Sequence, residues 1–169
     1  MVSPSDAGTE ALLGVLRGIP DPEVPALDIV ELGLVRRAEL SPDGAVTVEV
    51  TPTYSGCPAM RTIEQDILTA LHASGYERVE LRTVYLPAWT TDWLSDAAKA
   101  KLKAYGIAPP GHAVAEQTLV PLMSSAHRAT CPYCGSSHTE RKSEFGSTAC
   151  KAIHYCHGCQ QPFEEFKAI

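Results

Sequence analysis

Apolar residues recur at two different spacings along the first two thirds of the chain. Met60, Ile63, Ile67 and Leu71 repeat every three or four residues, which predicts the buried face of a helix. In other segments apolar and polar residues alternate, which predicts half-buried strands. In chain order, the pattern predicts a helix over 6–18, strands over 35–40 and 45–51, a helix over 58–74, a strand over 77–86 and a helix that begins at Thr91–Asp92 and ends at Tyr105.

Turn-forming residues separate these elements. Three prolines between Ile19 and Pro25 break the chain after the first helix, and Ser41–Gly44 is typical of a hairpin turn. Gly75 is expected to end the longest helix, because glycine is favoured just beyond a helix C-terminus. The order αββαβα predicts a small α+β sandwich domain over residues 6–110.

The last third of the chain has a different pattern. Residues 111–128 show little periodicity and are expected to form a linker. Residues 129–169 are expected to form an all-β zinc ribbon, with short strands over 138–145, 148–155 and 162–167.

Five of the six cysteines lie in this last module. Cys131 with Cys134, and Cys156 with Cys159, form two CxxC pairs separated by 21 residues, a spacing that brings four thiolates around one tetrahedral ion. The sequence therefore predicts one structural zinc per chain, although spacing alone does not separate zinc from iron. The role of Cys150, a small residue within an expected strand, stays open.

The charge balance excludes some classes of partner. The formal net charge is -6, which offers no field for binding nucleic acid or an anionic membrane. The ribbon's basic residues are matched in number by glutamates, which also argues against a phosphate-binding surface. No run of 18 apolar residues and no secretory leader are present, so a cytoplasmic location is expected.

Cys57 stands apart from the other cysteines. It precedes Pro58, at the expected start of a helix, where the helix dipole would lower the pKa of a thiol and make it reactive. An inert, buried cysteine is the alternative. Asp21 and Glu23, in the proline-rich loop, are candidates for binding a metal or orienting a partner, with solvated loop charges as the alternative.

Several motifs resemble known families. Asp21-Pro22-Glu23-Val24-Pro25, Asp28–Val35 and the strand that leads to Cys57-Pro58 resemble the metal–sulfur cluster assembly factors, over residues 8 to about 110. The more specific segments resemble the D-type subunits of phenylacetyl-CoA epoxidase systems; they are Thr51–Met60, Pro87–Ser95, Tyr105–Pro110, Phe145–Ala152 and Pro162–Lys167. Ala168 departs from that pattern, because relatives often carry a cysteine there.

The resemblance implies an accessory role in aerobic phenylacetate breakdown, in which the chain is not itself an enzyme but helps mature the epoxidase. The partners implied are other epoxidase subunits, either the reductase with flavin and an iron–sulfur cluster or the di-iron oxygenase. Cys57 would contact iron or a transient iron–sulfur cluster, and since one thiolate cannot hold a cluster, a homodimer or hetero-complex near Cys57 is expected. The alternative function is a non-catalytic structural adaptor that zinc stabilises.

Overall fold

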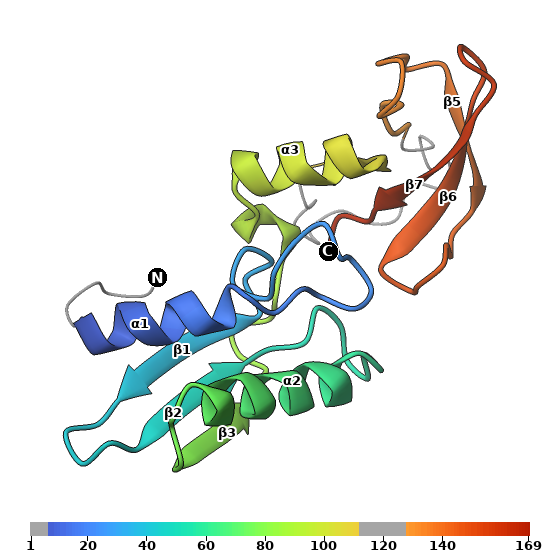
Figure 1. Cartoon of the computed structure of the whole chain (residues 1–169). Coiled ribbons are helices and arrows are strands. Elements are labelled where there is room, and N and C mark those ends of the chain that lie inside the picture. The colour runs from blue at the N-terminus through green and yellow to red at the C-terminus, as the bar shows by residue number, and fades with distance from the viewer. Residues whose placement is uncertain (1–6, 112–127) are drawn as a thin grey trace. The chain divides into compact units, whose positions relative to one another are not determined.

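The valine-rich segment after the Ser41–Gly44 turn forms the centre of the first sheet. The computed structural model describes residues 7–111 and 128–169, and in it β1 (Val35–Leu40) pairs antiparallel with β2 (Val46–Val50). β3 (Val79–Thr83) pairs parallel with β2, so the strand order is β1-β2-β3 (Figure 1). The valines of β2 alternate with half-buried residues, so one face of the sheet meets the core.

Two helices cover that face. α1 (Ala7–Leu16) contacts both β1 and α2 (Met60–Ala73), and α2 contacts β3 (Figure 1). The predicted stripe of α2 is confirmed, since Met60, Ile63, Ile67 and Leu71 are its buried residues. Gly75 follows the helix with a φ of 91°, a left-handed conformation that glycine adopts without strain.

The parallel pairing of β2 with β3 decides where the following loops begin. The carboxyl ends of parallel strands lie at the same end of a sheet, and Val50 is registered with Thr83 there. The segment 51–57 therefore leaves the sheet beside the segment 84–89. The N–H of Val84 donates to the carbonyl of Val50 at 2.8 Å, which ties the starts of the two segments together.

The contacts divide the chain after Trp89, into Met1–Trp89 and Thr90–Ile169. The second unit begins with a 3₁₀ turn, η1 (Thr91–Trp93), and continues with α3 (Asp96–Tyr105) and β4 (Ile107–Ala108). Its ribbon strands are β5 (Thr139–Ser143), β6 (Lys151–Cys156) and β7 (Pro162–Phe166), close to the three predicted strands. β4 joins them by pairing parallel with β7, in the order β4-β7-β6-β5.

The structure corrects the start of the last predicted helix. The Ser95 hydroxyl caps α3 by accepting the N–H of Ala98 at 3.1 Å, so the helix begins several residues after Thr91. The buried face of α3 consists of Ala98 and Leu102, whereas Ala97 and Tyr105 are exposed.

The order αββαβα is confirmed along the chain; the contacts divide the chain after Trp89, whereas the sequence pattern places the domain boundary at residue 110. The difference arises because β4 pairs with the ribbon sheet and α3 packs on β4. The predicted linker, 111–128, lies almost wholly outside the described residues. None of the helices in 7–111 and 128–169 has the length and apolar content needed to cross a bilayer.

Candidate functional sites: a thiol with carboxylates and a four-cysteine metal centre

Cys57 lies in a turn between β2 and α2. Its N–H donates to the carbonyl of Tyr54 at 3.3 Å, and its side chain is partly exposed. α2 begins at Met60, and Ala59 occupies the cap position with no side-chain cap. Cys57 therefore precedes the first helical residue by three positions, further from the helix dipole than the sequence predicted.

The loop of Asp21 and Glu23 is closed by backbone hydrogen bonds. Asp21 is buried, and its Oδ1 accepts the N–H groups of Glu23 at 2.8 Å and Val24 at 2.7 Å. The N–H of Asp21 donates to the carbonyl of Leu27 at 3.0 Å, which closes the loop at its base. One carboxylate oxygen of Asp21 thus fixes the backbone, and Glu23 is held half-buried beside it.

The structure brings these three predicted residues together. Burial raises the pKa of the Cys57 thiol, and the negative charges of Glu23 and Asp21 raise it further. The N–H of Ala59 and the side chain of Tyr54 hydrogen-bond the sulfur and oppose this rise. The predicted lowering of the Cys57 pKa is therefore wrong, because burial and two carboxylates outweigh the helix start.

Tyr54 is a site residue that the sequence analysis did not single out. Its side chain reaches the sulfur three positions along the chain because the turn from Tyr54 to Cys57 folds back on itself. The available signal was a hydrogen-bonding aromatic residue in the same glycine-containing loop as the cysteine.

The four predicted cysteine ligands in the second unit also come together. Their sulfur atoms all lie within 4.8 Å of one another, with 3.7 Å between Cys131 and Cys159 and 3.5 Å between Cys134 and Cys156. Four tetrahedral bonds of about 2.3 Å require sulfur atoms about 3.8 Å apart. All four cysteines are free, so the arrangement fits a single tetrahedral ion and not a pair of disulfides.

Backbone N–H groups point at the sulfurs and favour thiolates. Those of Cys159 and Gly158 lower the pKa of Cys156 to about 6, despite its burial. Burial raises the pKa of Cys159 to about 12. The proton of Cys159 would therefore leave only when a cation replaces it, which is the expected behaviour of a metal site.

The two CxxC turns use glycine for different reasons. Gly135 follows the first pair with a φ of 74°, a left-handed conformation that glycine adopts without strain. In the second pair the left-handed residue is Gln160, with a φ of 58°, and not Gly158. Gly158 is needed for space, since a Cβ there would lie 3.0 Å from the Ser136 hydroxyl oxygen.

The core around the cysteines is small. It consists of Ala108, Ala129, Cys131, Cys156 and Phe163, with Cys159 packed against it. Cys134 is exposed, so the centre is reached by solvent from one side. Cys150 is buried 3.1 Å from the Thr148 hydroxyl and does not belong to the four-sulfur group.

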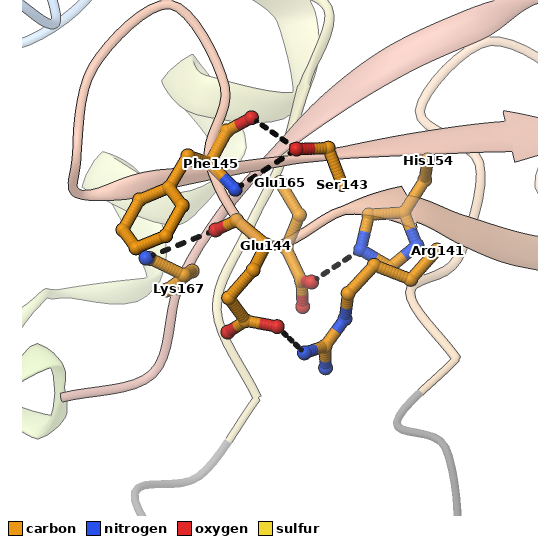
Figure 2. A network of polar contacts seen from close by, with 7 residues as sticks. All are labelled: Arg141, Ser143, Glu144, Phe145, His154, Glu165 and Lys167. Atoms are coloured by element: carbon orange, nitrogen blue, oxygen red, sulfur yellow. Dashed lines mark hydrogen bonds and ion pairs between the residues drawn. The ribbon is translucent and has the colours of Figure 1, made fainter.

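Polar contacts join the ribbon strands beside this core (Figure 2). His154 Nε2 lies 2.8 Å from Glu165 Oε2, and both side chains are buried on one face of the paired strands β6 and β7. Glu165 thus accompanies His154 into the interior and gives the imidazole a polar partner there. On the surface, Arg141 pairs with Glu144.

Two known families match different parts of the chain. Residues 9–81 match an "Iron-sulfur cluster assembly protein" family, and residues 115–167 match a "PaaD zinc beta ribbon domain" family. The Fe-S protein maturation auxiliary factor YitW of Bacillus subtilis is 35% identical over 57% of this chain and 95% of its own. A crystal structure of a domain of unknown function, DUF59, from Bacillus anthracis superposes with a TM-score of 0.53 at 30% identity, over 57% of this chain and 92% of that one.

A relative that matches both units is found in Escherichia coli K12. This protein, provisionally named as the D component of 1,2-phenylacetyl-CoA epoxidase, is 43% identical over 92% of this chain and 90% of its own length. The alignment takes in 155 residues and so extends over both units. The chain therefore belongs to the family of D-type subunits of 1,2-phenylacetyl-CoA epoxidase.

Proposed function

We propose that this chain is a non-catalytic accessory component of a phenylacetyl-CoA epoxidase in aerobic phenylacetate breakdown. Its task is to mature the complex by passing iron or an iron–sulfur cluster to another subunit, rather than to carry out epoxidation. The observation that carries the proposal is the partly exposed Cys57 thiol with Asp21 and Glu23 beside it. These residues lie in the segment that matches the iron–sulfur assembly family.

The arrangement suits a cation that is held briefly. The raised pKa of Cys57 means that the free thiol is protonated at neutral pH. When iron arrives as cargo, the S–H bond breaks, the proton leaves to solvent and an S–Fe bond forms. The carboxylates that disfavour a bare thiolate favour the positive charge of the iron.

A single thiolate also explains why the cargo would leave. Clusters in proteins are held by about four cysteine ligands, and Cys57 is the only cysteine among the described residues of the first unit. The remaining ligands must come from another chain or a small thiol. A client that offers a full set of ligands would then draw the iron away from Cys57.

Replacement of Cys57 tests this role. The epoxidase reductase is produced with the wild-type chain, with Cys57→Ser or with Cys150→Ser, and its iron and acid-labile sulfide are measured. Cys150 is the matched control, because it is a cysteine without a disulfide that lies outside both sites. We expect loss of metal content with Cys57→Ser alone. Full occupancy of both the reductase and the di-iron oxygenase with that variant would overturn the proposal and favour the structural adaptor.

The client is proposed to be the reductase with its flavin and cluster, or the di-iron oxygenase. The same experiment distinguishes them when the iron content of each component is measured separately. Loss confined to the reductase identifies a cluster as the cargo, and loss confined to the oxygenase identifies iron.

We also propose that the four-cysteine ion is zinc and that its role is structural. The four thiolates fill a tetrahedral shell, so no position is left for a substrate. Metal analysis of protein purified without added metal should give one zinc per chain. Less than about half an equivalent of metal per chain would contradict metal binding by the four cysteines. Iron instead of zinc would contradict the proposed identity of the ion.

A further inference from the structure

The first unit exposes two large apolar side chains, and they are consecutive. Leu86 is 86% exposed and Tyr85 is 62% exposed, and no other large hydrophobic side chain is exposed among the described residues up to Trp89. Single exposed apolar residues are common on protein surfaces, but adjacent ones at a functional edge mark an interaction site.

Both ends of the segment that carries them are anchored. The N–H of Val84 donates to the carbonyl of Val50 at 2.8 Å, and the buried Trp89 indole donates from Nε1 to the carbonyl of Leu32 at 2.9 Å. Tyr85 and Leu86 are therefore held outward between two fixed points, so their exposure does not come from a free chain end.

The two anchors also place the segment beside Cys57. Val50 is the last residue of β2, from which the chain continues into the loop of Cys57. Leu32 belongs to the segment that follows the loop of Asp21 and Glu23, and the N–H of Thr51 donates to the nearby Leu34 carbonyl at 2.9 Å. Tyr85 and Leu86 thus lie at the end of the sheet from which both site loops emerge.

The net charge of the first unit indicates what would dock there. Over residues 7–89 there are twelve aspartates and glutamates against six arginines and no lysine. Asp21 and Glu23 act on Cys57, and Glu64 accepts a hydrogen bond from the Thr83 hydroxyl at 2.9 Å, just before Tyr85. A partner surface that is complementary to this unit carries lysine or arginine around an apolar side chain.

We propose that Tyr85 and Leu86 form the docking surface for the protein client that Cys57 serves, and that the client binds with a basic, apolar patch. The inference rests on the proposed function, because it assigns the client's contact to the same end of the sheet as the thiol. Aromatic and apolar anchors of this kind dominate binding energy at protein interfaces, and charges mainly direct the encounter. Docking here would bring client ligands to Cys57 and supply what one thiolate lacks.

Binding measurements test the surface separately from the chemistry. The probes are the purified, cluster-free reductase and the purified di-iron oxygenase, each titrated with the full chain. We expect Leu86→Ser and Tyr85→Ser to weaken binding of one probe at least tenfold. Tyr105→Ser is the matched control, since Tyr105 is 59% exposed in the other unit and should leave the affinity unchanged. Binding should also weaken when NaCl is raised from about 0.05 M to about 0.5 M.

Each outcome decides between this surface and the proposed function. If Leu86→Ser binds both probes as tightly as the wild type, or the wild type binds neither, the docking surface is wrong. A further outcome is a concentration-dependent dimer of the wild type that Leu86→Ser abolishes. That result would show that a second copy of this chain binds at this surface, and it would overturn the proposal that the client binds there. Cys57→Ser should bind the client as tightly as the wild type but should no longer deliver the cluster or iron to it. If Cys57→Ser delivers its cargo fully while Leu86→Ser binds the client weakly, the proposed function is wrong and the docking surface still stands.

Discussion

The two units of the chain are stabilised in different ways. The first has an aliphatic core to which the stripe of α2 and the valines of β2 both contribute. The second has a small core that contains two of the four thiols and a buried His154–Glu165 pair. Charge differs as well, because the described residues of the second unit carry eight lysines and arginines against six acidic residues. The first unit can therefore expose a reactive loop on a self-sufficient scaffold, whereas the second depends on its ion.

Removal of the ion should produce the largest difference between the units. Cys131→Ser, or treatment with a chelator, removes a ligand set whose metal contributes about 10–16 kcal/mol in comparable small domains. We expect amide hydrogens in β5, β6 and β7 to lose protection from exchange, while those in β2 and α2 keep it. Exchange read by mass spectrometry checks this, with Cys57→Ser as the control. Equal loss in both units would mean that they fold as one cooperative body.

Breaking the buried His154–Glu165 pair should have the next largest effect. Glu165→Ala removes the carboxylate 2.8 Å from the buried His154 ring, and losing one partner of a buried polar contact costs about 1–3 kcal/mol. Glu144→Ala removes a surface partner of Arg141 and should cost less than about 1 kcal/mol. Denaturant unfolding of the metal-loaded protein measures both free energies. Similar values would show that burial does not distinguish the two pairs.

Much of this comparison could be predicted from the sequence. The spacing of Met60, Ile63 and Ile67 predicts α2 because apolar residues that recur every three or four positions match the helical period. The two CxxC pairs predict the four-sulfur group because ligand spacing is set by the metal and by local turns. In both cases the determinant lies within a short stretch of chain.

The features that were missed depend on contacts between distant segments. β4 has two residues, too few for a periodicity, and exists because β7 offers an edge. Glu165 is expected at the surface from its charge, but its burial follows from the presence of His154 on the neighbouring strand. The direction of the Cys57 pKa was predicted wrongly because the fold buries the thiol and brings Glu23 and Asp21 near it.

The pH dependence of Cys57 alkylation tests the raised pKa of this thiol. Alkylation requires the thiolate, and the raised pKa keeps the thiol protonated at neutral pH, so iodoacetamide should modify Cys57 slowly until the pH exceeds the ordinary thiol pKa. Glu23→Gln removes one charge that raises the pKa, so modification at pH 8 should become severalfold faster. Peptide mass spectrometry follows Cys57 separately from the other cysteines.

Glu77→Gln is the control for that variant, because Glu77 lies beyond the opposite end of α2 from Cys57. It should leave the alkylation profile unchanged. Fast modification of the wild type at pH 7 would contradict the raised pKa and would restore the helix-start explanation.

The smallest effect is expected where the two CxxC turns differ. Gly135 takes a left-handed conformation freely, but Gln160 adopts a φ of 58° at the equivalent position, which costs a residue with a Cβ about 1 kcal/mol or more. Gln160→Gly removes this strain and loses part of the gain to the greater freedom of glycine in the unfolded chain. We therefore expect the second unit to be stabilised by less than about 1 kcal/mol, whereas Gly135→Ala should destabilise it. Thermal unfolding with saturating metal checks both variants, and a loss of stability in Gln160→Gly would mean that the side chain of Gln160 contributes more than its backbone strain costs.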